Sequence, residues 1–332
     1  MRKLGVILLV VFLSSCGITD APKKPSATGK AGELLLVMDK EYWKGEAGDT
    51  FRSVFKANYP MFPQPEPIFD VVQIEKKAFK SIFENHRHIF IAEIKPDEPK
   101  ARIEASHDVW SYPQMVIKVI APDIESFNKT ISANADVFID YYIKKEFERI
   151  NNANARIPNH EIINTLKKKF GIKMTIPQGF YIAKEEDSFL WIRRTGTNED
   201  LDMSILLTIM PYKSSEHDFA FETIWERRDS ITKTHIPGQF PDTYMTTYPD
   251  IPPLFNEINF NGNYAVKAEG LWRVAGDFMG GPFMNYTLVN NNNLINLDAY
   301  IYYPNKDKRD FMRQLQAVIH SIEFVSKEES QE

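Results

Sequence analysis

The chain has 332 residues, of which 43% are hydrophobic and 26% are charged, and its formal net charge at pH 7 is −5. These fractions are typical of a globular protein and exclude a disordered, collagen-like or multi-span membrane chain. No strongly basic stretch is present, which excludes a nucleic-acid partner, because such proteins use clustered cationic side chains to neutralise phosphates. At roughly 100–200 residues per domain, this length predicts two domains or lobes.

The first sixteen residues predict export and lipidation. Arg2 and Lys3 precede ten mostly apolar residues, Leu4 to Leu13, and this run is far shorter than the ~20 residues of a spanning helix. Leu13-Ser-Ser-Cys16 resembles a bacterial lipobox, in which small residues precede the cysteine that receives diacylglycerol. Cys16 is also the only cysteine in the chain. We therefore predict a signal peptide over residues 1–15 and a lipid anchor on Cys16.

Residues 16–31 are predicted to form the lipidated cysteine and a flexible tether, because small residues, proline and lysine dominate the segment after Cys16. Gly17 follows the cysteine, where the inner-membrane retention signal of many Gram-negative bacteria has aspartate. The sequence therefore favours an exported protein that its N-terminal lipid anchors in the outer membrane, facing the periplasm.

Residues 32–150 predict an N-terminal α/β lobe. Its short apolar runs, bounded by polar residues, are typical of buried strands. Apolar residues from Ile124 to Tyr142 recur at steps of three and four, which predicts one long helix on the sheet, capped by Asp123 and ending near Ile150. Four prolines make Tyr59–Pro67 an extended loop. The predicted strands are 33–39, 69–74, 88–94 and 114–121, and a short helix ends at 58.

Residues 151–158 are polar and helix-breaking, so they predict a linker, and residues 159–326 predict a C-terminal α+β sandwich lobe. Gly171 is expected to end a helix that starts at Asn159, and Asn261-Gly262 is a strong hairpin signal. The other predicted elements are strands 172–176, 180–183, 189–194, 202–211, 282–289 and 294–303, with helices 215–231 and 307–322. Residues 327–332 predict a disordered tail.

These elements predict an α+β fold with two lobes. A mixed β-sheet with a long packing helix is followed by an antiparallel sheet flanked by helices. The order of elements in the second lobe resembles that of the Mog1/PsbP-type fold, in which helices pack on a curved antiparallel sheet. This analogy rests on element order and implies no activity.

Several segments together resemble one family. With the lipobox, they are similar to the Bacteroidota lipoprotein family of domain of unknown function 4837, over about Gly29 to Phe324. The resemblance implies an envelope lipoprotein from that phylum and brings no known activity or catalytic residue. The segments are Gly29-Lys-Ala-Gly-Glu33, Tyr42-Trp43, Pro63–Pro67 with Phe69-Asp70, Trp110 with Pro113-Gln114, and Gly276–Phe283.

The sequence carries no signature of a common catalytic site. It lacks the His-Glu-x-x-His, Gly-x-Ser-x-Gly and phosphate-loop patterns, and lipidation of Cys16 uses its only thiol. His86 and His88 share one side of a predicted strand, but no third ligand is evident beside them, so no metal site and no cofactor are predicted. His320 lies opposite the apolar stripe of the last helix and is expected to be exposed.

Five residues are candidates for ligand binding, because aromatic side chains beside polar groups recognise sugars and peptides. Two belong to a loop of the first lobe. The other three flank Gly280-Gly281, where the simpler interpretation is a tight turn between two strands. The candidates are Trp110, Gln114, Asp277, Phe278 and Phe283.

Two weaker patterns concern hydrolysis and modification. Glycoside hydrolysis needs two carboxylates across a cleft, and Asp277 with Glu257 or Glu269 is a conceivable pair on neighbouring predicted strands. Asp229-Ser230-Ile231 resembles the O-glycosylation site of exported Bacteroidota proteins, which makes Ser230 a candidate for modification.

The leading hypothesis is a lipid-anchored, non-enzymatic module that binds or assembles another envelope component, which would be a protein, a glycan or a peptide. The alternative is a carboxylate-dependent hydrolase that acts on envelope glycans or peptides. A third hypothesis, a carrier of a soluble ligand, requires a sizeable apolar cavity in the second lobe. A cleft with two close acids would favour the hydrolase, and a groove without such a pair would favour binding.

Overall fold

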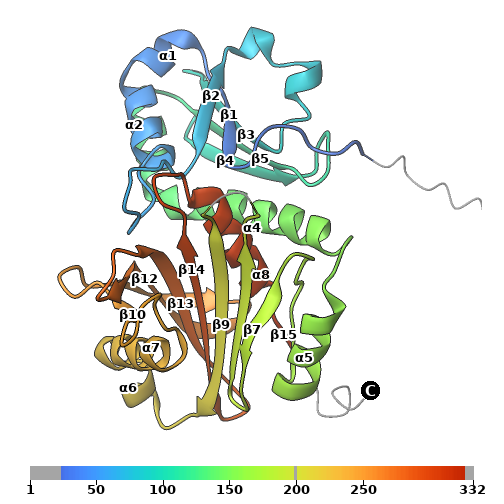
Figure 1. Cartoon of the computed structure of the whole chain (residues 1–332). Coiled ribbons are helices and arrows are strands. Elements are labelled where there is room, and N and C mark those ends of the chain that lie inside the picture. Colours follow the sequence, from blue (N-terminus) through green and yellow to red (C-terminus); the bar gives the residue numbers. More distant parts are fainter. Residues whose placement is uncertain (1–23, 198–199, 326–332) are drawn as a thin grey trace, which may run out of the picture.

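The computed structural model of the chain describes residues 24–197 and 200–325 (Figure 1). The predicted signal peptide, the predicted lipidation site Cys16 and the predicted tail at 327–332 lie outside the described residues. The described chain forms two β-sheets with helices packed on them, which confirms the predicted α+β fold class.

The first sheet is mixed and has five strands in the order β2-β1-β3-β5-β4. Strand β1 is parallel to β2 and β3, and β3 is parallel to β5, whereas β4 runs antiparallel to β5 at the edge. The short α1 helix (Lys40–Lys44) and the 3-10 turns at Lys76–Ala78 and Ser81–Phe83 lie in its connections. The strands are β1 (Glu33–Val37), β2 (Asp70–Ile74), β3 (His88–Ile94), β4 (Arg102–His107) and β5 (Met115–Ala121).

Helices α2 (Glu46–Phe55), α3 (Ile124–Ala133) and α4 (Ala135–Asn154) cover one face of this sheet. The sequence predicts one helix across the last two, but the chain breaks at Asn134, whose side chain donates to the Thr130 carbonyl at 2.8 Å. The apolar stripe still packs on the sheet, because Phe127, Ile131, Phe138 and Tyr142 all lie in the core.

The second sheet is antiparallel and has eight strands in the order β10-β12-β13-β14-β9-β8-β7, with β11 beside β12. Its strands are β7 (Tyr181–Glu185), β8 (Phe189–Thr195), β9 (Asp202–Pro211), β10 (Tyr244–Thr247), β11 (Leu254–Phe260), β12 (Asn263–Ala275), β13 (Gly280–Asn290) and β14 (Asn293–Tyr302). A separate pair joins β6 (Ile172–Lys173) to β15 (Glu323–Phe324). Strand β10 lies where the sequence analysis predicts no strand.

Helices cover both faces of the second sheet. Helices α5 (His160–Phe170) and α8 (Arg309–His320) pack on one face, and α7 (Phe221–His235) packs on the other (Figure 1). The short α6 (Ser215–Asp218) precedes α7, so the single helix predicted over 215–231 is divided into two.

Local signals place several element ends correctly. The Asn159 side chain accepts from the Ile162 amide, and Gly171 ends α5 with φ +64°, as predicted. Asn261 and Gly262 both have positive φ between β11 and β12, which is the backbone that a tight hairpin requires.

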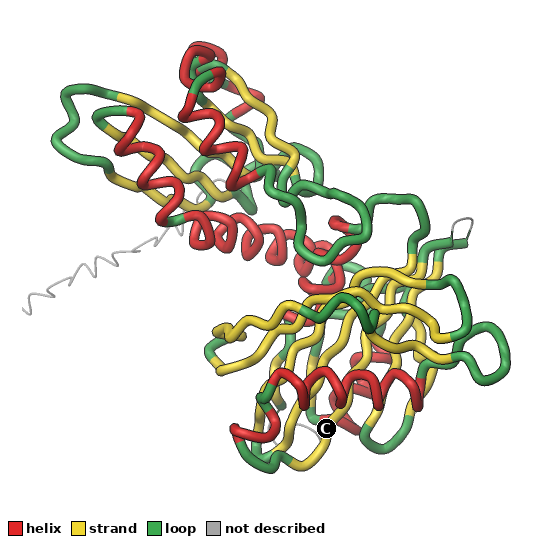
Figure 2. The backbone as a smooth tube through the Cα atoms, turned by 90° about the vertical axis from the view of Figure 1, so that its left-hand side faces the viewer, coloured by secondary structure: helices red, strands yellow, loops and turns green. Residues whose placement is uncertain are grey.

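Helices α4 and α8 lie against each other between the two sheets (Figure 2). Phe147, Ile150 and Ala317 form a small apolar cluster at this contact. Helix α8 also buries Leu315 and Ile319 against the second sheet, so it is covered on two sides. The two helices therefore form the main junction between the lobes.

The described part of the predicted tether lies on the first lobe, which corrects the expectation of a flexible segment there. Ala27 N donates to Tyr112 O at 3.0 Å, and Thr28 N donates to Asn85 O at 2.8 Å. The Arg87 side chain donates to the carbonyls of Thr28 and Gly29. These bonds hold the backbone of residues 25–29 on the first lobe, and the part of the predicted tether before residue 24 lies outside the described residues.

Candidate functional site

A cleft of about 790 Å³ lies where the two lobes meet. Helix α4 forms one wall, and the β11–β12 hairpin and the end of α8 form the other. Its lining residues come from positions 59 to 320, so the fold assembles them from both lobes: Tyr59, Asp140, Ile143, Lys144, Phe147, Glu148, Asn151, Ile258, Asn259, Asn261, Gly262, Lys267, Tyr286, Gln316 and His320.

A tyrosine–glutamine–tyrosine chain lies at the base of the cleft. Tyr59 donates its hydroxyl to Gln316 Oε1 at 3.1 Å, and Gln316 Nε2 donates to the Tyr286 hydroxyl at 3.3 Å. Burial is the main cause that raises the pKa of both tyrosines above the usual value, so both phenols stay protonated at neutral pH. These two hydrogen bonds link the proline loop of the first lobe to the second sheet through Gln316 of α8.

His320 is packed rather than exposed, which contradicts the prediction from the helix pattern. Its ring centroid lies 5.0 Å from Phe147, 4.6 Å from Phe260 and 5.4 Å from Tyr286. Burial, followed by the charge of Lys267, lowers the pKa of His320 to about 4. The imidazole is therefore neutral at pH 7 and forms part of an aromatic wall.

The charged groups of the cleft occur in pairs. Lys144 Nζ lies 2.6 Å from Asp140 Oδ2, and Lys267 Nζ lies 2.8 Å from Glu269 Oε2. Asn151 donates to a backbone carbonyl of α8 at 2.8 Å, while its buried Oδ1 has no hydrogen-bond partner among the described residues. The cleft thus offers balanced charges beside aromatic rings.

An open sheet edge borders the cleft. Strand β11 pairs with β12 in regular register from Leu254 to Phe260, and its other side has no partner strand within residues 24–197 and 200–325. Ile258 and Asn259 of β11 line the cleft. Backbone groups of an edge strand are available to a further extended chain, which makes this edge a candidate interface.

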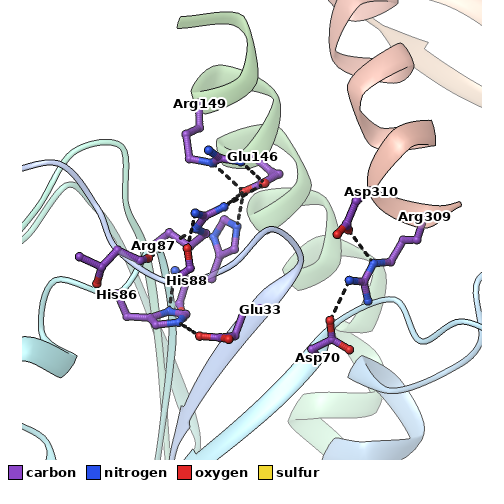
Figure 3. A network of polar contacts seen from close by, with 11 residues as sticks. Glu33, Asp70, His86, Arg87, His88, Glu146, Arg149, Arg309 and Asp310 are labelled. Atoms are coloured by element: carbon purple, nitrogen blue, oxygen red, sulfur yellow. Dashed lines mark hydrogen bonds and ion pairs between the residues drawn. The ribbon is translucent and has the colours of Figure 1, made fainter. Parts of the chain in front are cut away.

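A buried carboxylate on α4 joins this helix to the first sheet (Figure 3). Glu146 is 2% exposed and accepts from Arg87 at 3.2 Å, from His88 Nε2 at 3.1 Å and from Arg149 at 2.7 Å. Burial alone would raise the pKa of Glu146, but the hydrogen bonds from His88 and Arg149 outweigh it and hold the pKa well below the usual value.

The two histidines considered as metal ligands have separate partners (Figure 3). His86 Nε2 lies 2.6 Å from Glu33 Oε1, whereas His88 turns to Glu146. Burial lowers the pKa of His88, so its ring is neutral at pH 7. No group of three or more His, Cys, Asp or Glu side chains suited to a metal occurs in the part of the chain that the structure describes.

The start of α8 binds the first lobe. Both Glu66 oxygens accept from the Lys308 amide, and one also accepts from the Arg309 amide at 2.7 Å. The Arg309 side chain donates to Asp70 at 2.8 Å and to the Pro67 carbonyl at 2.9 Å (Figure 3). Glu66 of the proline loop therefore caps a helix of the other lobe. The loop itself turns back, because Tyr59 N donates to Glu66 O at 2.6 Å and Asn58 forms an antiparallel bridge with Pro67, so the prediction of an extended loop is wrong.

The structure does not bring the five predicted ligand-binding residues together. Trp110 and Gln114 lie in the first lobe, where Gln114 is fully buried and donates to the backbone carbonyls of Glu84 and His86 at 2.6 and 2.7 Å. Its Oε1 accepts from the Trp110 amide at 2.9 Å. Gln114 therefore holds two loops in place and does not face a ligand.

The other three candidates lie in the β12–β13 turn or in β13. The turn is at residues 276–279, whereas Gly280 and Gly281 pair with Arg273 and Trp272 inside β13, so the simpler interpretation of Gly280-Gly281 as a tight turn is wrong. Phe278 is fully exposed at the tip of the turn, and Asp277 Oδ1 accepts from the Phe278 amide at 2.6 Å. Phe283 is 1% exposed, with the Arg228 guanidinium 3.5 Å from its ring centroid. Phe283 is therefore a core residue, and the predicted rim of all three residues is wrong.

The carboxylates considered for hydrolysis do not form a pair across a cleft. Glu257 is opposite Val266 in the β11–β12 register, and Glu269 is three residues further along β12. Successive side chains alternate between faces, so Glu257 and Glu269 point to opposite faces of the sheet. Asp277 lies beyond the end of β12, in the turn.

Ser230 is exposed within α7, five residues before the helix ends, rather than at a helix end as the sequence predicts. Its carbonyl accepts from the Thr234 hydroxyl at 2.8 Å. Its modification stays a prediction.

Sequence reasoning does not identify the cleft. Tyr59 lies in the proline loop, Asn261 and Gly262 give the hairpin signal, and His320 is expected to be exposed, so none of them is predicted as part of a cleft, while Lys267, Gln316 and Asn151 have no local pattern. Each lies in an ordinary strand or helix and reaches the cleft only because the lobes pack together.

Comparisons with known proteins relate the chain to uncharacterised domains. A search of curated proteins finds no match. Similar solved structures include the cyanobacterial PsbP protein of Synechocystis sp. PCC 6803, with 13% identity and a TM-score of 0.31, over 46% of this chain and 86% of that one. Human StAR-related lipid transfer protein 5 has 10% identity and a TM-score of 0.23, over 52% and 96% of the two chains. A Bacteroides thetaiotaomicron VPI-5482 protein has 9% identity and a TM-score of 0.23, over 48% and 46%.

These TM-scores are too low to support an argument about function. Every helix in the described ranges is too short or too polar to cross a membrane. Residues 27–155 match the model of domain of unknown function 8532, and residues 159–321 match that of domain of unknown function 4837. The resemblance inferred from the sequence therefore holds for the second lobe, while a separate family model matches the first. The C-terminal lobe of this chain belongs to the family of domain of unknown function 4837.

Proposed function

We propose that this protein is a lipid-anchored protein of the cell envelope that binds an extended peptide segment of another envelope protein along β11 and the interlobe cleft. The observation that carries this proposal is the open edge of β11 beside a cleft of about 790 Å³. The peptide adds a strand to β11 through backbone hydrogen bonds, and its alternate side chains enter the cleft.

The side chains at the edge suit an added strand. Leu254 and Glu257 are exposed, and Ile258 contributes an apolar group at the mouth of the cleft. The aromatic wall around His320 provides the apolar contact that a side chain of the ligand needs.

The proposed location follows from the sequence. The lipobox at Leu13–Cys16 supports lipidation, and Gly17 in place of an aspartate supports the outer membrane, with the protein facing the periplasm. The Cys16→Ala variant should leave the membrane fraction. Retention of this variant after a carbonate wash would contradict the anchor without bearing on the peptide site.

A photo-crosslinking amino acid at Glu257, which is exposed on β11, tests the peptide site in living cells. The matched control carries the same group at Asp187, which is fully exposed on a different turn. A protein adduct specific to position 257 is expected. Equal adducts at both positions, or none, would contradict the proposal.

A segment identified in this way should then be tested as a synthetic peptide on the purified protein. The amides of β11 should exchange hydrogen more slowly when the peptide is bound, because an added strand bonds the free edge. Protection that is confined to other strands would place the peptide elsewhere.

The alternative of a carboxylate-dependent hydrolase has weaker support at this cleft. Asp140 and Glu148 both line it, but they lie eight residues apart on α4, which corresponds to about 12 Å along the helix axis. Glycosidase carboxylates lie roughly 5–9.5 Å apart. Each acid is also bonded to a lysine, at 2.6 Å for Asp140 and at 2.7 Å for Glu148. Turnover of envelope glycans or peptides that the Asp140→Asn variant abolishes would favour the hydrolase.

A further inference from the structure

The described N-terminal segment is bonded to one loop of the first lobe (Figure 1). The Pro25 carbonyl accepts from the Tyr112 amide at 2.9 Å, and the Tyr112 carbonyl accepts from the Ala27 amide at 3.0 Å. Loop 108–113 therefore fixes the point from which the chain continues toward Cys16.

The sequence limits how far this point lies from the proposed anchor. Lys24 is eight residues after Cys16, and a fully extended chain spans at most about 3.6 Å per residue, or about 29 Å in total. Helix α4 has 20 residues and is about 30 Å long, because an α-helix rises about 1.5 Å per residue. The bilayer that holds the Cys16 lipid is therefore within about one length of α4 of Lys24.

Two apolar side chains protrude near this point. Ile82 is 72% exposed in the turn at 81–83, and Val109 is 39% exposed in the loop that holds the N-terminal segment. Each follows a residue with positive φ, +54° at Ser81 and +53° at Asp108, which is uncommon outside glycine. Strained backbone next to exposed apolar side chains favours a surface that interacts with a partner.

The turn and the loop are joined to each other and to the N-terminal segment. Asn85 O accepts from the Thr28 amide at 2.8 Å and from the Ser111 hydroxyl at 3.0 Å. The ring centroids of Phe79 and Trp110 lie 5.5 Å apart on the sheet face opposite α2, α3 and α4. These contacts make three segments one end of the first lobe, which we call the anchor end: residues 24–28, 81–85 and 108–113.

Lysines accompany the two apolar side chains. Lys24 and Lys80 are exposed at or next to the anchor end, and the ion pairs of the described residues include neither of them. Lys24 donates to the Asp108 carbonyl, which leaves its charge without a carboxylate. Apolar side chains beside lysines suit the interface of a bilayer, because the apolar groups enter the lipid and the ammonium groups meet the headgroup phosphates.

We propose that the anchor end lies on the bilayer that holds the Cys16 lipid, with Ile82 and Val109 inserted among the lipids. This inference rests on the lipid anchor of the proposed function and goes beyond it, because it gives the protein one orientation. A protein held by its lipid alone is free to turn, whereas two inserted side chains fix the side of the first lobe that faces the membrane. Phe278, the fully exposed tip of the second lobe, stays in water.

Insertion should be measured on the lipidated mature protein in vesicles of three parts phosphatidylethanolamine and one part phosphatidylglycerol. The lipid occupies Cys16, so Ile82→Cys supplies one free thiol for a polarity-sensitive fluorophore. Phe278→Cys is the control, because its side chain is fully exposed as well. Lipids with a quencher on the acyl chain should quench the label at position 82 roughly threefold more than the label at position 278, since inserted groups lie about 5–10 Å into the headgroup and acyl boundary.

A second pair of variants tests whether the two side chains insert together. With the fluorophore on Val109→Cys, the added change Ile82→Asp should reduce quenching roughly twofold, because a carboxylate at the neighbouring tip resists entry into the lipid. The matched control is Phe240→Asp, which changes a 56% exposed aromatic residue of the second lobe and should leave the quenching at position 109 unchanged.

Three results would overturn the proposal. Equal quenching at positions 82 and 278 would remove the preferred orientation, and stronger quenching at 278 would place the second lobe on the bilayer. Unchanged quenching at position 109 in Ile82→Asp would show that Ile82 does not insert beside it.

Vesicle flotation separates this test from that of the anchor. Protein that floats with the vesicles while the label at position 82 stays unquenched refutes the orientation alone. Protein that does not float refutes the lipid anchor on which the orientation rests. The crosslink at Glu257 reports the peptide site independently of both.

Discussion

Two carboxylates that are equally buried in the two regions of the molecule respond to burial in opposite ways. Glu146 at the lobe junction is 2% exposed, and Asp298 on β14 is 1% exposed. The pKa of Glu146 is held well below its usual value, whereas burial raises the pKa of Asp298 despite the ion pair with Arg228 at 2.8 Å. Burial therefore does not decide the charge state alone.

The number of donors explains the difference. Glu146 accepts from two arginines and one histidine, so favourable interactions exceed the cost of removing the carboxylate from water. Asp298 has one arginine and the Asn285 amide at 3.2 Å, and the nearby charge of Asp229 opposes ionisation. The surroundings of Glu146 thus favour its ionised form, while burial in the core of the second lobe raises the pKa of Asp298.

The largest effect is expected for Glu146→Ala, which leaves Arg87, His88 and Arg149 without their acceptor. Arginine cannot release its proton, so the free energy of unfolding should fall by about 3–5 kcal/mol. Chemical denaturation measures this loss, with Glu148→Ala as the control on the same helix. The control residue is half-buried and pairs with Lys145 at 2.7 Å. A loss as large in this control would contradict the importance of Glu146.

A smaller, pH-dependent effect is expected for Arg228→Met. The variant leaves Asp298 buried without its cation and removes the contact with Phe283, so it should cost about 3 kcal/mol at pH 8. The pKa of Asp298 is already raised, so its contribution to stability is largest at low pH and is lost as the pH rises through the folded pKa. The cost should therefore be smaller at pH 5. Equal costs at both values would show that Asp298 stays ionised.

The contribution of His320 to stability should change with pH in the opposite direction to that of Asp298. Its pKa is lowered to about 4 from 6.5, so its contribution is present above pH 6.5 and is lost as the pH falls toward 4. The difference between these two pKa values corresponds to at most about 3 kcal/mol in the free energy of unfolding. His320→Phe keeps the aromatic packing and should flatten the stability profile in this window, whereas His160→Phe at the exposed start of α5 should not. A profile unchanged by His320→Phe would mean that the ring is protonated without cost.

Much of the fold is predictable because its signals are local. The bounds of β3 and β9 agree with the predicted strands, since each is an apolar run between polar residues. The cap at Gly171 depends on one residue in the left-handed region. Strand β4 (Arg102–His107) is missed because all six side chains are exposed, so it has no apolar pattern and pairs only as an edge.

The candidate site is not predictable from such signals. His320 lies on the side of α8 where its ring contacts Phe147 of α4, Phe260 of β11 and Tyr286 of β13. The prediction of exposure is wrong because α4 and the β11–β12 hairpin cover that side of α8, and this contact joins residues more than 150 positions apart. The apolar pattern of a helix predicts the face that packs on the nearest sheet, but it does not predict whether another element covers the remaining faces.

The smallest effect concerns a third buried carboxylate, which is stabilised by backbone amides rather than by cations. Glu66 is 3% exposed, and its oxygens accept from the amides of Lys308 and Arg309 at the start of α8. Glu66→Gln keeps one acceptor oxygen and loses the charge that favours a helix N-terminus, so it should cost about 1 kcal/mol. Glu66→Ala removes both acceptors and should cost more, because the amides are buried between the lobes. Chemical denaturation of both variants beside Glu146→Ala sharpens the comparison. If Glu66→Gln cost as much stability as Glu146→Ala, the charge of Glu66 would contribute as much to stability as the charge of Glu146.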